Sequence, residues 1–301
     1  MNPGTSGKAT VAEALRAGLT SGLPRLEAEW LLLHALGHGE AGRAWLIAHD
    51  TDPLDTDALA RYQGLCTRRL QGEPVAYLIG QRGFHGLTLL VDARVLDPRP
   101  DTETLVDWAL EVLHDRPTPA VLDLGTGSGA IALAVQYRRP DARVWALDAS
   151  ADALDVARAN ATRLDLPVNF AQGHWLRGWP PTASESAPTR FDLIVSNPPY
   201  IRADDPHLAA LTHEPLSALA SGPDGLDDLR EIVATAGSHL KPGSWLLLEH
   251  GWDQADAVAA LLSTQGYADV AHRLDLGGHR RCTGGRWPDT PHPNRDTPVQ
   301  G

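Results

Sequence analysis

The stretch that decides the fold covers residues 120–173 and reads "AVLDLGTGSGAIALAVQYRRPDARVWALDASADALDVARANATRLDLPVNFAQG". It alternates a short apolar run, a glycine-rich turn, a helical pattern, a second apolar run and a second helical pattern. Short apolar runs bounded by turn residues predict buried strands, and their alternation with helices predicts a parallel sheet with helices on both faces. We therefore expect an α/β fold built on a doubly wound sheet.

Segments on both sides of this stretch extend the pattern. An amphipathic helix with an acidic first turn is predicted at 101–115, a further strand at 191–195, a helix around 226–240 and a strand at 244–249. These segments complete one sheet domain, which we expect to occupy residues 99–287.

The residues before this domain have a different character. Apolar residues at helical spacing predict helices within 11–36, around a Ser-Gly-Leu-Pro break, and within 55–72, where Asp55 or Thr56 is the expected N-cap. We expect residues 1–72 to form a small helical domain for substrate recognition. Short apolar runs with glycines predict a hairpin-like connector at 73–98, and a tail rich in proline and polar residues, 288–301, is expected to be disordered.

Composition excludes several classes of protein. With 301 residues and 43% hydrophobic residues the chain can form about two globular domains, and it has neither a membrane-length apolar run nor the order of a signal peptide, so we expect a cytoplasmic protein with no membrane partner. A net charge of −12 repels phosphate backbones and argues against direct nucleic-acid binding. The two cysteines and the scattered histidines suggest neither a disulfide framework nor a metal site.

The glycine turn predicts a nucleoside site. Gly125, Gly127 and Gly129 follow a strand and open a helix, a place where the backbone can approach a ligand closely. Alone, this triplet is a weak signal, because a tight structural turn has the same sequence. Asp148 ends the next strand, 21 residues after Gly127, and a carboxylate there can accept hydrogen bonds from both hydroxyls of a ribose.

Charge favours one nucleoside cofactor over another. The spacing GxGxG differs from the dinucleotide fingerprint GxGxxG, and Asp123 adds a carboxylate that repels a pyrophosphate but suits a cation. S-adenosylmethionine has a ribose, an amino group and a sulfonium, and it has no phosphate. We therefore expect this cofactor rather than NAD.

An unusual strand ending, "DLIVSNPPYI" at 192–201, predicts where the reaction takes place. The strand it ends is the fourth of the predicted sheet, and open α/β sheets bind their ligands at the carboxyl ends of their strands. Pro198 and Pro199 each fix φ, so the turn is rigid, and neither contributes an N–H group. The turn therefore offers acceptors, to which Asn197 adds a side-chain carbonyl and Tyr200 an aromatic face.

Such a turn suits a planar NH₂ group. The Asn197 side chain and the Pro198 carbonyl can accept its two N–H bonds while the ring of Tyr200 covers its plane. An amide nitrogen is a poor nucleophile, and holding both hydrogens favours pyramidalisation and aims the developing lone pair at an electrophile, which is catalysis by positioning and electrostatics. The alternative, a rigid structural turn or a cis-proline, ranks below this interpretation beside the glycine turn and Asp148.

The three motifs together are typical of methyltransferases that modify planar amino groups, and further segments narrow the choice. These are "RRLQGEPVAYLIGQRGF" at 68–84, "LDPRPDTETLV" at 96–106, "EPLSALASGPDGLDDLREI" at 214–232, "LKPGSWLLLEHG" at 240–251 and "DLGGHRR" at 275–281. In order and spacing they resemble the peptide chain release factor glutamine methyltransferase family, from about Val11 to Arg281.

This resemblance implies a Rossmann-like methyltransferase sheet with a small N-terminal helical domain. It implies N5-methylation of the glutamine in the Gly-Gly-Gln motif of class-1 release factors by S-adenosylmethionine, which modulates translation termination. The cofactor contacts implied are Gly125, Thr126, Gly127, Ser128, Gly129, Asp148, Trp175 and Asn197. The target glutamine is expected on Asn197, Pro198, Pro199 and Tyr200, with Asn197, Pro198 and Tyr200 catalytic and Trp175 near the adenine.

Four further positions allow more than one role. Arg99 and Glu103 belong to a family motif that either shapes the pocket entrance or forms a structural ion pair, and Glu249 at a strand end is equally ambiguous. His174 stands where the family usually has an acidic residue, so a contact with the adenine amino group is weakened or replaced.

Three alternatives remain. A sister family with the same core methylates a glutamine of a ribosomal protein. Amino methylation of DNA or RNA needs a basic recognition region, which the charge of −12 does not supply. A binding protein without activity is disfavoured, because the glycine turn, Asp148 and the NPPY run are all intact.

Overall fold

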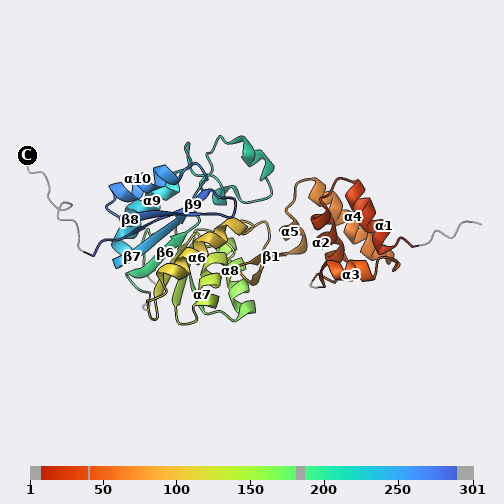
Figure 1. The fold of residues 1–301 in the computed structure, drawn as a ribbon, viewed down its shortest axis with the longest axis horizontal. Coiled ribbons are helices and arrows are strands. Elements are labelled where there is room, and N and C mark those ends of the chain that lie inside the picture. The colour runs from red at the N-terminus through yellow and green to blue at the C-terminus, as the bar shows by residue number, and fades with distance from the viewer. Residues whose placement is uncertain (1–7, 40, 181–186, 290–301) are drawn as a thin grey trace, which may run out of the picture. The chain divides into compact units, whose positions relative to one another are not determined.

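The computed structural model describes residues 8–39, 41–180 and 187–289. They divide into two compact units at the junction of Gln81 and Arg82, and Figure 1 labels most of their elements. Of the predicted disordered tail, 290–301 lies outside the described residues. Within the described ranges no helix is both long and apolar enough to cross a membrane.

The first unit is helical, as predicted. Its helices are α1 (Val11–Thr20), α2 (Arg25–Ala35), α3 (Gly42–Ala48), α4 (Thr56–Leu70) and α5 (Val75–Ile79). Thr10 and Glu13 form a reciprocal capping box at the start of α1, and Asp55 caps α4 by accepting the N–H of Ala58 at 2.6 Å. The Asp55 cap and the break between α1 and α2 confirm the sequence prediction.

One expectation for this region was wrong in part. Residues 75–79 were expected within a hairpin-like connector, but they form the short helix α5, which begins after Pro74 and ends at Gly80 in a left-handed conformation with φ of 73°. The helix forms because Val75, Leu78 and Ile79 pack against the core of the helical unit. The expected hairpin follows it, with β1 (Gln81–Phe84) and β2 (Leu87–Leu90).

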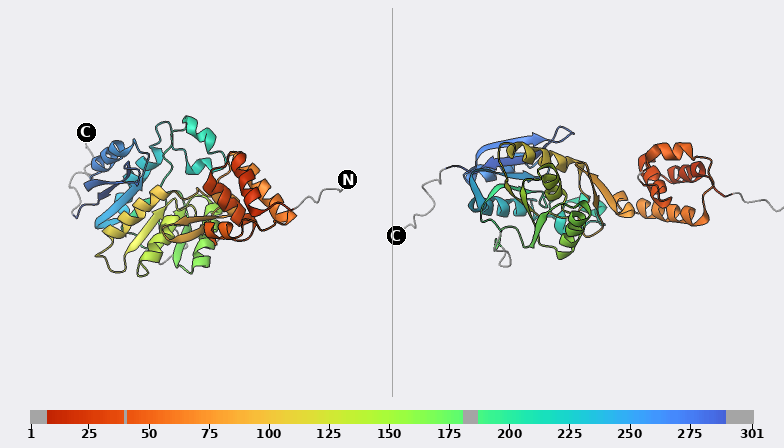
Figure 2. Two further views of the ribbon diagram at one scale, coloured as in Figure 1. Left: turned by 45° about the vertical axis from the view of Figure 1, so that its right-hand side comes forward. Right: turned by 90° about the horizontal axis from the view of Figure 1, so that it is seen from below.

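The second unit contains the predicted sheet. Its strands are β3 (Ala120–Leu124), β4 (Arg143–Asp148), β5 (Val168–Gln172), β6 (Phe191–Ser196), β7 (Leu240–Glu249), β8 (Ala268–Leu274) and β9 (Arg280–Arg286). Its α-helices are α6 (Glu103–Val112), α7 (Ala130–Arg138), α8 (Ala151–Leu164), α9 (Asp227–Ala236) and α10 (Ala255–Thr264), and its short 3-10 turns are Pro100–Thr102, Pro206–Ala210, Leu216–Ala218 and Gly237–His239. α6 and α7 lie side by side in each view (Figures 1 and 2).

The sheet has the order β5-β4-β3-β6-β7-β9-β8. The strands from β5 to β7 pair in parallel, whereas β9 pairs antiparallel with both β7 and β8. This confirms the predicted doubly wound α/β class. The antiparallel pair β8 and β9 at one edge was not predicted.

Two helical layers cover the sheet. On one face, Leu122 and Leu124 of β3 share a core with Leu229 and Ile232 of α9 and with Val258 of α10. The helices α6, α7 and α8 cover the opposite face (Figure 1). Burial of this apolar surface on both faces is what stabilises a parallel sheet of this kind.

The strand order reverses at the gap between the neighbouring strands β3 and β6. From β3 the chain proceeds to β4 and β5 on one side, and it then returns to place β6 on the other side of β3. Such a switch point opens a crevice at the carboxyl ends of the two central strands, where α/β proteins bind ligands. The glycine turn follows β3 and the NPPY run follows β6, so the fold brings both motifs to this crevice.

Candidate active site

The glycine turn needs its glycines for both conformation and space. Gly125, Gly127 and Gly129 have φ of 70°, 55° and 84°, in the left-handed region that side chains disfavour. A Cβ on Gly125 would lie 3.2 Å from the ring of Trp175, and one on Gly129 would lie 3.0 Å from Leu133. A Cβ on Gly127 would meet no atom within 4 Å, so the turn is tightly packed at Gly125 and Gly129 and open at Gly127.

Asp148 is held at the end of β4 by the turn itself. Its Oδ2 accepts the N–H of Gly127 at 2.9 Å, and its Oδ1 accepts the N–H of Ser150 at 2.9 Å. Burial raises the pKa of Asp148 above its ordinary value, against the lowering effect of these bonds. Each carboxylate oxygen has a further lone pair, so the fixed carboxylate can still accept two hydroxyls.

Asp123 lies buried beneath the turn. Its Oδ2 accepts the Thr126 hydroxyl at 2.6 Å and the N–H of Ala132 at 3.2 Å, while its Oδ1 has no hydrogen-bond partner among the described residues. Burial raises the pKa of Asp123 to about 7. A buried acceptor without a partner favours a ligand with positive charge or N–H groups and disfavours phosphate.

Trp175 adopts a strained backbone. Its φ is 47°, a conformation that costs about 1 to 3 kcal/mol for a bulky residue. In this conformation its ring contacts Gly125, and its indole N–H donates to Asp228 Oδ1 at 2.9 Å. Beside it, half-exposed His174 has Nδ1 at 3.6 Å from Glu231 Oε1, so carboxylates of α9 lie next to both residues.

The orientation of Asn197 is set by a residue far away in the sequence. Its Nδ2 donates to the hydroxyl oxygen of Thr102 at 3.2 Å, and Thr102 ends the 3-10 turn before α6. Because the NH₂ end of the amide is occupied, the carbonyl end, Oδ1, stays available as an acceptor. No local sequence pattern could have indicated Thr102, which is 95 residues from Asn197.

A cavity of about 150 Å³ opens beside the NPPY run. Its lining residues are Leu96, Arg99, Asn197, Pro198, Tyr200, Ile201, Leu211, Ala218 and Leu219. Among the described residues the one cis peptide bond precedes Pro180, so Pro198 and Pro199 follow trans bonds. The NPPY run forms one wall of this cavity, and Leu96, Ile201, Leu211, Ala218 and Leu219 add apolar side chains.

The far wall of the cavity comes from an excursion of the chain between 202 and 219. Ile201 closes its base, since the N–H of Ile201 donates to Leu219 O and the N–H of Ser221 donates to Ile201 O, both at 2.9 Å. Within the excursion, buried Glu214 accepts from Arg99 at 2.5 Å. Arg99 therefore both lines the cavity and forms an ion pair.

The partner of Arg99 is Glu214 and not Glu103. Glu103 instead accepts the N–H of His85 at 2.8 Å and so ties the start of α6 to the turn between β1 and β2. Asp97 adds a second carboxylate near Arg99, at 3.8 Å. The sequence pattern indicated these motif residues without indicating how they pair.

Glu249 lies buried at the end of β7, below the NPPY run. Its Oε1 accepts the Tyr200 hydroxyl at 3.3 Å, and its Oε2 has no hydrogen-bond partner in the described part of the chain. Burial raises the pKa of Glu249 to about 7, while Thr102 and Arg281 act in the opposite direction. Burial and Glu249 likewise raise the pKa of Tyr200, which stays neutral.

The sheet and the residues at its crevice define a methyltransferase. Residues 102–222 match the family model described as the methyltransferase small domain. Among solved structures, human methyltransferase 10 domain containing protein superposes with a TM-score of 0.51, covering 69% of this chain and 90% of that one. At 16% sequence identity this likeness concerns the fold alone.

Residues 10–80 match the model described as the PrmC N-terminal domain. A release factor glutamine methyltransferase of Xylella fastidiosa is 50% identical over 278 residues, 91% of this chain and 98% of the relative. One of Burkholderia pseudomallei is 48% identical over 296 residues, 96% of this chain and 100% of the relative. The chain belongs to the release factor glutamine methyltransferase family, which confirms the resemblance of its motifs.

Membership of a methyltransferase family implies S-adenosylmethionine as the methyl donor, and the residues at the crevice fit it. Asp148 offers two acceptor positions for ribose hydroxyls, and the unpartnered Oδ1 of Asp123 suits the cationic part of the molecule. The N–H groups of Gly127 and Gly129 already donate to Asp148 and to Thr126 O, so they are not free to bind a pyrophosphate.

Proposed function

We propose that this protein methylates the side-chain amide nitrogen, N5, of the glutamine in the Gly-Gly-Gln motif of class-1 peptide chain release factors, and thereby modulates translation termination. Near full-length identity of about half to curated release factor glutamine methyltransferases supports the substrate. The observation on which the chemistry rests is that Asn197 lines the cavity while its Nδ2 donates to Thr102, which leaves its Oδ1 as an acceptor.

In this proposal the glycine turn and Asp148 hold the cofactor, together with Thr126, Ser128, Trp175 and Asn197. Asp148 binds the ribose, and the ring of Trp175 lies against Gly125 at the edge of the adenine position. When bound, S-adenosylmethionine supplies a methyl group on a positively charged sulfur. The crevice at the switch point lies between the turn after β3 and the run after β6, so donor and acceptor sites are adjacent.

The NPPY run holds the target amide. Asn197 Oδ1 and the Pro198 carbonyl accept its two N–H bonds, Pro199 keeps the turn extended, and Tyr200 covers its plane. This arrangement fixes the nitrogen in line with the methyl group and stabilises the positive charge that develops on it. Transfer would break the carbon–sulfur bond, leaving its electron pair on sulfur, and would form the N–C bond. Asn197 Oδ1 and the Pro198 carbonyl would orient the two N–H bonds, and one of the two protons would then pass to solvent.

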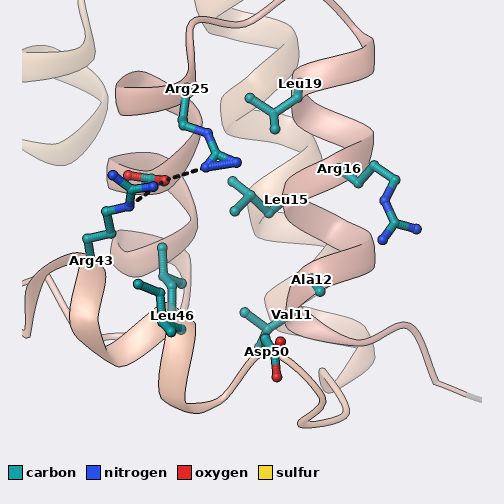
Figure 3. A pocket seen from close by; sticks show the side chains of 11 residues that line it. Val11, Ala12, Leu15, Arg16, Leu19, Arg25, Arg43, Leu46 and Asp50 are labelled. Atoms are coloured by element: carbon teal, nitrogen blue, oxygen red, sulfur yellow. Dashed lines mark ion pairs between the residues drawn. The ribbon is translucent and has the colours of Figure 1, made fainter.

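We place substrate recognition on the helical unit, which includes α5 and ends at Gln81, and catalysis on the domain at 99–287. A hollow of about 310 Å³ on the helical unit supports this role (Figure 3). Leu15 and Leu19 of α1 face Arg25 and Arg43 across it, and both arginines approach the buried carboxylate of Glu29, at 3.7 and 3.4 Å. Apolar walls with an excess of positive charge suit an acidic, amphipathic protein segment. The enzyme would meet this substrate in the cytoplasm.

The decisive test is mass spectrometry after incubation with methyl-labelled S-adenosylmethionine. The substrates are a release factor, the same release factor with its Gly-Gly-Gln glutamine changed to alanine, a ribosomal protein and DNA. One methyl group on the glutamine, absent from the alanine variant, is the expected result. Label on the ribosomal protein or on DNA, with the release factor untouched, would overturn the assignment of the substrate.

A further inference from the structure

The side chain of Gln254 joins three segments of chain at the end of the NPPY run. Gln254 is half-buried and immediately precedes α10. Its Nε2 donates to the Tyr200 carbonyl oxygen at 3.0 Å, and its Oε1 accepts the N–H of Gly251 at 2.8 Å. Nε2 also lies 3.4 Å from the carbonyl oxygens of Asp224 and Gly225. The NPPY run, the turn after β7 and the loop before α9 therefore meet at one amide.

The surroundings of this amide permit one orientation. Its NH₂ end faces backbone carbonyl oxygens, which accept, and its carbonyl end faces a backbone N–H, which donates. If the amide turned over, Oε1 would face the Tyr200 carbonyl and Nε2 would face the Gly251 N–H, so both bonds would be lost. Gln254 is therefore fixed as a donor to Tyr200.

The bond to Tyr200 completes the fixation of one peptide group. The carbonyl of Tyr200 and the N–H of Ile201 belong to the same planar unit. Gln254 binds the carbonyl, and Leu219 O accepts the N–H at 2.9 Å. Because both polar groups are bound, rotation of this plane would break both bonds. The two bonds therefore set ψ of Tyr200 and φ of Ile201.

Other contacts of the NPPY run restrain Tyr200 less. Pro198 and Pro199 have no N–H with which to anchor the run. The Tyr200 hydroxyl lies 3.3 Å from Glu249 Oε1, which is long for a bond between two oxygens. Gly225 packs directly on the carbonyl that Gln254 binds, because a Cβ there would lie 2.3 Å from Tyr200 O. The position of Tyr200 therefore depends on its backbone contacts more than on its hydroxyl.

We propose that Gln254 is a positioning residue for methyl transfer, which holds the Tyr200 backbone so that the ring covers the plane of the target amide. Tyr200 lines the cavity and Gln254 does not, so Gln254 acts through Tyr200 and does not touch the substrate. Without this donor the peptide between Tyr200 and Ile201 can turn, and the ring no longer keeps the amide nitrogen in line with the methyl group. This inference rests on the proposed function, because it concerns the same reaction.

The test uses two changes that keep the length of the side chain. Gln254→Glu keeps an acceptor for Gly251 and places a carboxylate oxygen against the Tyr200 carbonyl, while Gln254→Met removes both polar contacts and adds no charge. We expect kcat with a release factor to fall roughly 10- to 100-fold in each variant, as for other small misplacements near a reacting group. KM and the dissociation constant for S-adenosylmethionine should change little, because Asp148 and the glycine turn are intact.

Two measures separate positioning from a loss of folding. The value of kcat is expressed per active site, counted from the stoichiometry of S-adenosylmethionine binding, so unfolded protein does not lower it. A purely structural role would lower the melting temperature and the number of sites and would leave kcat per site unchanged. Asp253→Ala, at the exposed neighbour in the same turn, is the control and should keep the wild-type kcat.

A second arm tests whether Gln254 acts through the Tyr200 ring. Tyr200→Ala removes the ring and keeps the backbone carbonyl. In this background Gln254→Met should lower kcat by at most about twofold further, because the ring that Gln254 positions is gone. Losses of kcat that multiply in full would show that Gln254 acts on another part of the site.

The two proposals fail on different results. If wild-type protein leaves the release factor unmethylated, the proposed function fails. If it methylates the release factor while either folded Gln254 variant keeps full kcat per site, or if the losses in the double variant multiply in full, the positioning role fails and the proposed function stands.

Discussion

Leu124 and Ser196 end two neighbouring parallel strands in register, and the Ser196 hydroxyl donates to the Leu124 carbonyl at 2.7 Å. Both residues are fully buried. The next residues along each strand are Gly125 of the turn and Asn197 of the NPPY run. This single pairing therefore sets the distance between the residues proposed to hold the methyl donor and those proposed to hold the acceptor.

Asp148→Ala should act mainly by raising the dissociation constant for S-adenosylmethionine. The change removes the two acceptor positions for ribose hydroxyls and leaves the N–H groups of Gly127 and Ser150 without their partner. At about 1 to 3 kcal/mol for hydrogen bonds to a charged group, we expect a loss of roughly 10- to 100-fold. Calorimetric titration measures it, with Asp152→Ala, an exposed aspartate in the first turn of α8, as the control. An unchanged dissociation constant would remove the ribose assignment.

Asn197→Ala should act on the chemical step. The variant loses the acceptor that orients the target amide, so methyl transfer should fall by at least about 100-fold, while S-adenosylmethionine binding remains measurable by calorimetry because Asp148 and the glycine turn are intact. Single-turnover assays with a release factor report the transfer rate. Turnover near the wild-type value would contradict the proposed role of the NPPY run.

Asp123→Asn should change how stability depends on pH. The pKa of Asp123 is raised from 3.8 to about 7, so between these values the folded state binds more protons than the unfolded state. The contribution of Asp123 to the unfolding free energy is therefore fully present below about 4 and is lost as pH rises to about 7. The variant has no such loss, because asparagine keeps the acceptor for Thr126 and Ala132.

We therefore expect the stability of Asp123→Asn relative to wild type to increase between pH 4 and 7 and to level off above. Denaturant unfolding at several pH values without cofactor measures it. Other titrating groups, such as His250, whose pKa burial lowers to about 4, are present in both proteins and cancel. A constant difference across this range would show that Asp123 titrates normally.

Replacing each of two glycines of the helical unit by alanine should change the free energy of unfolding in opposite directions. Gly64 lies exposed within α4 with no atom within 4 Å of an added Cβ, so Gly64→Ala should stabilise the protein by about 0.5 to 1 kcal/mol. A Cβ on Gly18 of α1 would lie 2.1 Å from the hydroxyl of buried Tyr62, so Gly18→Ala should destabilise it by about 1 to 3 kcal/mol. Chemical denaturation of the two variants, side by side, decides the signs.

Ile47→Glu should separate recognition of the protein substrate from chemistry. Ile47 lines the hollow of the helical unit and is 66% exposed, so the change should not disturb folding. KM for a full-length release factor should rise several-fold, while KM for a short Gly-Gly-Gln peptide should stay constant. Leu70→Glu, at an exposed apolar residue outside this hollow, is the control. Equal KM values for wild type and Ile47→Glu would argue against this hollow as the recognition site.

The sequence was sufficient to predict those parts of the fold whose local residue pattern fits a single kind of structure. Alternating apolar runs and helices within 120–173 predicted the parallel sheet, and the positions of the glycine turn, Asp148 and Asn197 at strand ends followed from it. The strands β8 and β9 were missed because "ADVAHRL" and "RRCTGGR" are too polar and too rich in glycine to resemble buried strands. They form because Thr283 and Cys282 of β9 pair with the buried end of β7, and β8 then pairs with β9.

The contacts that orient the site could not be predicted in this way. Thr102 and Asn197 are 95 residues apart, Arg99 and Glu214 are 115 apart, and neither pair follows any periodicity. Trp175 was predicted near the adenine, but its left-handed backbone and its bond to Asp228 depend on how α9 packs. Such contacts result from the tertiary fold, so a single sequence does not contain a signal for them.

Residues 202–219 form a loop whose two ends meet at its base, where Ile201 makes backbone hydrogen bonds with Leu219 and Ser221. A loop closed at its base by backbone bonds can be exchanged as a cassette, provided that Glu214 is retained for Arg99. Leu211, Ala218 and Leu219 of this segment line the cavity together with Asn197, Pro198 and Tyr200. This loop is separate in sequence from the glycine turn and Asp148, which are proposed to bind the methyl donor. Exchanging the loop could therefore change which protein substrate is preferred while the residues for methyl transfer stay in place.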